Sequence, residues 1–205
     1  MSKSGRFGKY GEQKRMARLR ESGTRDIKPE AKMRPGSIAH PQPHWKGSSK
    51  TRVLIREARP SDAAFIETLS AKAFGQYGPY EKMLPEWFLV GITLTLVAVQ
   101  GGGRMGFVML GIINSDPSSV RASELLAIAV EPKAQRRGIG DNLMRHIMKA
   151  AAERCVEKIV LHTGVDNLAA QALFEKYGFV GAGHKVKFYP NGQNALMMIR
   201  TVDQG

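Results

Sequence analysis

The sequence predicts an α/β domain in which a mixed, mostly antiparallel sheet carries helices on both faces. The strand-like runs "TLTLVAVQ" and "MGFVMLGII" flank the turn "GGGR", which predicts a hairpin. The strand "SELLAIAV" precedes an apolar-periodic helix from Gly138 to about Glu153. The strand "KIVLH", the helix "NLAAQALFEKYG" and two last strands around "FVGAGH" and "NALMMIR" follow. Strands that alternate with helices in this order are typical of a layered α/β fold.

The start of the domain adds one strand and two helices. The run "RVLIREA" is rich in β-branched and apolar residues and predicts the first strand. Either Ser61 or Asp62 is suited to cap the helix that follows. A second, weaker helix is expected over roughly Tyr80 to Val90. The apolar residues of the first helix fall at helical spacing, at Phe65, Ile66, Leu69 and Ala73.

The composition changes at Arg52, which divides the chain into two parts. Residues 1–52 hold 14 Lys and Arg against 4 Asp and Glu, so most of the net charge of +13 lies there. We therefore predict a basic, flexible N-terminal extension over residues 1–51, with a short helix at Glu12 to Glu21, and a folded domain over 52–205. The extension leaves three roles open: a solvated tail, an arm that contacts RNA or the ribosome through residues 1–50, or a contact in a homodimer.

Several classes of protein are excluded by composition. No apolar run approaches the roughly 20 residues that a membrane-spanning helix needs, so we expect no membrane partner. The single cysteine, Cys155, has no partner within the chain, which indicates a reducing compartment and hence the cytoplasm. We expect no metal site.

The segment "QRRGIG" at the start of the Gly138 helix predicts an anion site. The first amides of a helix lack partners and carry the positive end of the helix dipole. Gly138 and Gly140 leave room for an anion to approach them, and Arg136 and Arg137 add positive charge. The segment matches neither the P-loop nor the dinucleotide fingerprint, so it indicates a phosphate or diphosphate without naming the ligand.

The sequence on either side of this loop indicates the protein family more specifically. The stretches "AIAVEPKAQRRGIGDNLM" and "NLAAQALFEKYGF" resemble the GCN5-related N-acetyltransferase (GNAT) superfamily, and in part the ribosomal-protein alanine acetyltransferases, over roughly Arg52 to Val202. The resemblance implies a GNAT-type fold with acetyl-CoA as co-substrate. It also implies direct transfer of an acetyl group to a primary amine on a protein N-terminus, a lysine or a small molecule. The cofactor-binding residues that it implies are Ile128, Ala129, Val130, Gln135, Arg136, Arg137, Gly138, Ile139, Gly140, Asn167 and Phe174.

Direct attack on a thioester needs a neutral amine, and therefore a group that removes its proton. Glu124 lies six residues before Val130, where several relatives place this base, and strand alternation is expected to put it on the same face as Ile128. His162 is the competitor, because ribosomal-protein alanine acetyltransferases carry a catalytic glutamate at that position. Glu124 is the preferred base, and a solvated glutamate at a strand end is the alternative.

Two further positions leave alternatives open. The resemblance implies a tyrosine that protonates the departing thiolate where this chain has Phe174, so either Tyr177, one turn later, or water is the candidate acid. Tyr177 is explained equally well as a packing residue, and Asn167 as a helix cap. The alternative to an enzyme is an acyl-CoA-binding module of weak activity, tethered to RNA or the ribosome by the basic extension.

Overall fold

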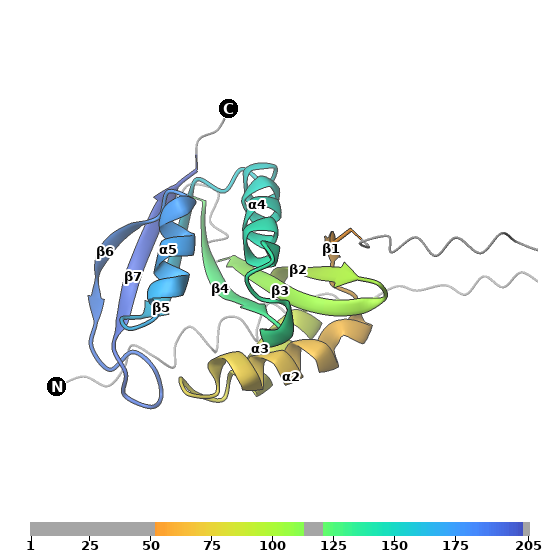
Figure 1. Ribbon diagram of the computed structural model, residues 1–205. Helices are drawn as coiled ribbons and strands as arrows, with labels where there is room; N and C mark the ends of the chain where they lie inside the picture. The colour runs from red at the N-terminus through yellow and green to blue at the C-terminus, as the bar shows by residue number, and fades with distance from the viewer. Residues whose placement is uncertain (1–51, 113–120, 203–205) are drawn as a thin grey trace, which may run out of the picture. The chain divides into compact units, whose positions relative to one another are not determined.

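The computed structural model describes residues 52–112 and 121–202 (Figure 1). The predicted extension and its helix at Glu12 to Glu21 lie outside the described residues. In the described part, no helix has both the length and the apolar character that crossing a membrane requires.

Seven strands form one sheet in the order β1-β2-β3-β4-β5-β7-β6. Every neighbouring pair is antiparallel except β4 and β5, so the prediction of a mixed, mostly antiparallel sheet is confirmed. The strands are β1 (Leu54–Glu57), β2 (Thr93–Gln100), β3 (Gly103–Ile112), β4 (Ala122–Val130), β5 (Lys158–Gly164), β6 (Val180–Lys185) and β7 (Ala195–Thr201). The α-helices are α2 (Ala63–Phe74), α3 (Tyr80–Leu89), α4 (Ile139–Ala152) and α5 (Leu168–Lys176).

The helices cover opposite faces of the sheet, as the sequence predicted (Figure 1). One core lies under α4 and α5, where Leu143, Ile147 and Phe174 pack with Leu125 and Leu161 of the strands. The other core lies under α2 and α3. Its buried members are Ile66, Leu69, Leu84, Val97, Phe107, Met109, Ala127 and Ala129. We call these the α4 face and the α2 face of the sheet.

A β-bulge in β4 exchanges the two faces partway along the strand. Met109 of β3 pairs with Ala127, but the next residue, Leu110, pairs with Leu125, so Leu126 is the extra residue. Leu125 packs in the α4-face core and Ala127 in the α2-face core, although simple alternation would put both on one face. The expectation that alternation puts Glu124 on the same face as Ile128 is therefore wrong. Ile128 packs on the α4-face core, while Glu124, next to Leu125, points to the α2 face.

The parallel pairing of β4 with β5 is short. It joins Ala122 through Leu125 to Lys158 through Leu161 and then ends, although both strands continue. Beyond this point β4 stays paired only with β3, and β5 only with β7. The backbone groups that Ile128 to Val130 turn toward β5 are thus not used by the sheet. The carbonyl of Val130 accepts a hydrogen bond from the side chain of Gln135, and the other groups are available to a ligand.

Asp62 ties the first strand to the helices. Its side chain is fully buried and accepts hydrogen bonds from Arg56 (2.7 Å) and Arg104 (2.5 Å), and from the backbone N–H of Arg59 (2.7 Å). It does not cap α2 through its side chain, because the two arginines take its oxygens. The hydrogen bond from Arg56 is the main reason that the pKa of Asp62 lies well below its usual range.

We predict that Asp62→Asn destabilises the domain by about 3 kcal/mol at pH 7, because it leaves two arginines without their buried counter-charge. A carboxyl whose pKa is lowered by folding stabilises the fold above its unfolded pKa of about 4 and loses that contribution as pH falls. Urea unfolding at pH 7 and pH 3 should therefore show a gap between the two proteins that narrows at pH 3. The control is Glu57→Gln, whose carboxylate is 71% exposed beside Arg154. An equal effect of both changes at pH 7 would contradict this account.

Candidate active site

The start of α4 has the geometry that an anion site requires. Gly138 is the N-cap of the helix, with a φ of 75°, and Arg136 also has a positive φ of 59°. A Cβ added to Gly138 would meet no atom within 4 Å, so the space above this residue is open. A glycine cap offers no side chain to the first amides of the helix. These N–H groups therefore face space that an incoming anion can enter.

Two side chains of the loop hold it against the sheet. Arg137 donates to Oε1 of Gln100 at the end of β2 (2.7 Å), and Gln135 donates to the backbone carbonyl of Val130 at the end of β4 (3.1 Å). The remaining arginine, Arg136, is exposed. Gln135 and Arg137 thus position the loop, and Arg136 and Arg137 are both exposed, so both place positive charge at the start of α4.

The two candidate bases, Glu124 and His162, lie together. Nδ1 of His162 is 2.9 Å from Oε1 of Glu124, across the last residues at which β4 and β5 pair. Both residues point to the α2 face, since their neighbours Leu125 and Leu161 are in the α4-face core. With the carboxylate ionised and the imidazole neutral, Nδ1–H donates to Glu124. The sequence predicted Glu124 and His162 as alternative bases, whereas in the structure their side chains form a hydrogen-bonded pair.

The surroundings distinguish the two members of the pair. The His162 ring stacks on Phe188, with centroids 4.4 Å apart and planes 18° from parallel. The His162 side chain is only 9% exposed, and its Nε2 is buried with no hydrogen-bond partner among residues 52–112 and 121–202. The Glu124 side chain is 32% exposed. A substrate can therefore reach the carboxylate of Glu124 but not the free nitrogen of His162.

An aromatic wall stands beside this pair. Tyr77, in the turn between α2 and α3, packs on Tyr189 of the loop between β6 and β7, with ring centroids 4.5 Å apart. Asn191 of the same loop donates to the backbone carbonyl of Gln76. Burial raises the pKa of the Tyr189 hydroxyl above its ordinary value. The loop between β6 and β7 is thus fastened to the α2–α3 turn.

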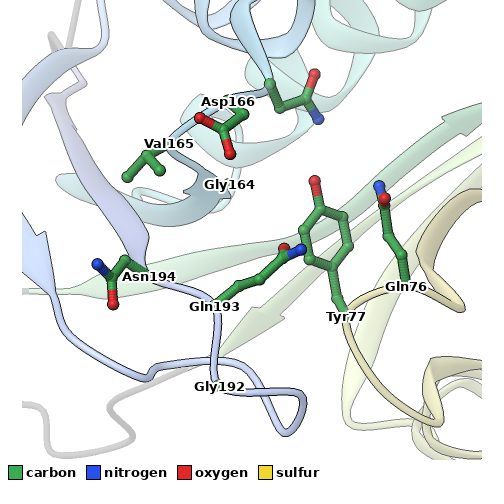
Figure 2. A pocket seen from close by; sticks show the side chains of 9 residues that line it. Gln76, Tyr77, Gly164, Val165, Asp166, Gly192, Gln193 and Asn194 are labelled. Atoms are coloured by element: carbon green, nitrogen blue, oxygen red, sulfur yellow. The ribbon is translucent and has the colours of Figure 1, made fainter.

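A cavity of about 530 Å³ opens where this turn, this loop and the end of β5 meet (Figure 2). Figure 2 shows the Tyr77 ring and the Gln76 side chain on one side and Gln193 on another. The lining is almost entirely neutral and polar. It consists of Gln76, Tyr77, Gly164, Val165, Asp166, Asn167, Gly192, Gln193 and Asn194.

The other predicted residues occupy structural positions. Asn167 caps α5, since its Oδ1 accepts from the N–H of Ala170 (3.2 Å), and it also lines the cavity. Phe174 is 5% exposed and packs against Phe179. The hydroxyl of Tyr177 donates to the backbone carbonyl of Asp141 (2.6 Å). Burial first, and then the hydrogen bond with Asp141, raise the pKa of Tyr177.

Sequence reasoning missed Phe188 and Tyr77. Both lie in connections, "HKVKFYPNG" and "AFGQYGPY", that carry no periodic pattern. The only available signal was the density of aromatic residues in these two connections. Within the part of the chain that the structure describes, no group of three or more His, Cys, Asp or Glu is placed to hold a metal ion.

Comparison with known proteins identifies the family. The model of the acetyltransferase (GNAT) family matches residues 63–179, more than half of the chain. An N-alpha-acetyltransferase of Saccharolobus solfataricus is 28% identical over 153 residues, which cover 71% of this chain and 91% of that protein. A ribosomal protein bS18-alanine N-acetyltransferase of Salmonella typhimurium is 39% identical over 69 residues, 34% of this chain and 47% of the relative.

Solved structures support the same fold. The structure of yncA from Salmonella typhimurium, which contains its cofactor acetyl-CoA, has a TM-score of 0.63 at 19% identity and covers 75% of this chain and 95% of yncA. The resemblance to the GNAT superfamily expected from "QRRGIG" and "ALFEKYGF" is confirmed. The chain belongs to the acetyltransferase (GNAT) family and is an acyltransferase.

Proposed function

We propose that this protein transfers the acetyl group of acetyl-CoA directly to the N-terminal amine of a protein. The observation that carries this proposal is the Glu124 carboxylate, held by His162 beside the point where β4 and β5 part. The names of two relatives, one an N-alpha-acetyltransferase and one specific for the alanine of a ribosomal protein, support a protein N-terminus as the acceptor.

The start of α4 fits the diphosphate of acetyl-CoA. The open space at Gly138, the unused amides and the exposed Arg136 supply room and positive charge. Asp141 in the first turn would repel an anion, but its carboxylate is bound by Lys176, whose hydrogen bond lowers the pKa of Asp141. The backbone groups of Ile128 to Val130 that no strand uses would accept the pantetheine arm. When bound, acetyl-CoA supplies a thioester carbonyl that an amine can attack.

In this proposal Glu124 is the general base and His162 is the positioning residue. A base must be within hydrogen-bond reach of the proton that it removes, directly or through one water. Glu124 meets this requirement because its carboxylate is partly exposed, whereas Nε2 of His162 is enclosed. The imidazole, fixed by its stacking on Phe188, donates to one carboxylate oxygen and leaves the other for the amine.

The cofactor loop can be tested by substitution at its glycine cap. We expect Gly138→Ala to weaken acetyl-CoA binding at least about tenfold, because the new methyl group fills the open space and strains the positive φ. Gly91→Ala is the matched control, since Gly91 has a φ of 73° and equally open surroundings but lies between α3 and β2. Both variants should lose similar stability. Calorimetry that finds equal acetyl-CoA affinity in the two variants would refute the assignment of this loop.

Substitutions at Glu124 and His162 separate the base from the positioning residue. Glu124→Gln should lower kcat by roughly a hundredfold and leave acetyl-CoA affinity nearly unchanged. His162→Phe, which keeps the stacking on Phe188, should lower kcat less and retain the acidic limb of the rate–pH profile. The double variant should be no worse than Glu124→Gln alone, since the two residues act as a unit. Loss of the acidic limb in His162→Phe but not in Glu124→Gln would reverse the two roles.

The identity of the acceptor amine can be tested with peptides. We expect peptides that begin with a free amine to be acetylated at that amine. The same peptides with a blocked N-terminus and an internal lysine should remain unmodified. Mass spectrometry locates the added acetyl group. Acetylation confined to the lysine side chain would rule out an N-terminal acceptor, and binding of acetyl-CoA without any transfer would favour a cofactor-binding module.

A further inference from the structure

The reaction needs a second proton transfer, which the residues assigned so far do not supply. When an amine displaces CoA, the departing thiolate is stabilised if a nearby acid protonates it. At Phe174 the resemblance to the GNAT superfamily implies a tyrosine acid, but a phenyl ring has no proton to donate. Glu124 and His162 are paired with each other on the receiving side of the reaction.

Tyr177, the tyrosine nearest to Phe174 in sequence, is poorly placed for this role. Its hydroxyl donates to the backbone carbonyl of Asp141 (2.6 Å) and lies 3.1 Å from the carboxylate of the same residue. Asp141 is in the first turn of α4, so this tyrosine links the end of α5 to α4. The proton of the Tyr177 hydroxyl is therefore already used in a hydrogen bond between α5 and α4.

Tyr77 is placed differently. A methyl group added to Gly164, the last residue of β5, would lie 2.7 Å from the Tyr77 hydroxyl. Gly164 follows His162 by two residues and therefore faces the same side of the sheet. The hydroxyl thus stands on the α2 face, at the end of the strand segment that β4 no longer pairs.

The Tyr77 hydroxyl is also available. Within residues 52–112 and 121–202 it has no hydrogen-bond partner, and it points into the cavity that Asn167 also lines (Figure 2). The ring is held by Tyr189, so the position of the hydroxyl is fixed although its proton is free. The other titratable groups at this wall are Tyr80, Tyr189, Asp166, and His162 and Lys185, which contact Phe188.

We propose that Tyr77 is the catalytic acid that protonates the departing sulfur. This inference rests on the proposed function. The amine nitrogen forms a bond to the acetyl carbon and gives one proton to Glu124, while the C–S bond breaks and the phenol of Tyr77 gives its proton to the sulfur. The products are an amide and the thiol of CoA. Transfer of the proton from Glu124 to the Tyr77 phenolate through water restores both groups.

The test compares two variants, Tyr77→Phe and Tyr177→Phe, each of which removes one tyrosine hydroxyl. Tyr77→Phe keeps the ring on Tyr189 and should lower kcat at least about tenfold, with unchanged acetyl-CoA affinity and acceptor KM. The fall of kcat at alkaline pH, where the acid loses its proton, should disappear. Tyr177→Phe should lose about 1 kcal/mol of stability through its bond to Asp141 and should keep both kcat and the alkaline limb.

Three results would overturn the inference. Unchanged kcat and an unchanged alkaline limb in Tyr77→Phe would remove Tyr77 from the chemistry, while acetyl transfer by the parent protein would leave the proposed function intact. Loss of the alkaline limb in Tyr177→Phe alone would assign the acid to Tyr177. A parent protein that binds acetyl-CoA but transfers nothing would defeat the proposed function, and the inference with it.

Discussion

The short pairing between β4 and β5 is the constraint on which the site depends. Four residues of each strand pair in parallel and then the strands separate, so the sheet is continuous at one end and divided at the other. The bulge at Leu126 falls just after the last pair. An extra residue in one strand increases the local twist of that strand and moves the side chains that follow to the opposite face of the sheet. Both effects favour the separation of the strand from its neighbour. A regular β4 would have continued beside β5 and left no backbone groups unpaired.

The bulge also separates two kinds of chemistry. Beyond Leu126, Ile128 faces α4, whose first turn has open amides and follows the loop that carries Arg136 and Arg137. Before it, Glu124 faces α2 and the aromatic wall of Tyr77, Tyr189 and Phe188. The positive charge proposed to bind the anionic cofactor thus lies on one face of β4. The carboxylate proposed to accept the proton of the amine lies on the opposite face. This separation matters because a carboxylate close to the diphosphate would weaken cofactor binding through like-charge repulsion.

Much of the fold was predictable because it depends on local patterns. The helix of Ile139–Ala152 follows from its apolar spacing and its glycine cap, and the hairpin of β2 and β3 from "GGGR" between two apolar runs. The glycine-bearing loop before α4, which we propose as the anion site, was predictable for the same reason. The face of Glu124 was not, because a bulge is decided by pairing with β3 and leaves no mark in the alternation of "SELLAIAV". The pairing of Glu124 with His162, 38 residues apart, likewise arises only from the sheet.

The central claim is that an acetyl group bound through α4 is presented to Glu124 across the opening between β4 and β5. A crystal structure of the protein with acetyl-CoA tests it most directly. The account predicts the diphosphate on the amides that follow Gly138. It also predicts the pantetheine along Ile128 to Val130, with the thioester carbonyl on the α2 face and within one water molecule of Glu124. A thioester that remains on the α4 face, or a diphosphate bound away from Gly138, would contradict it.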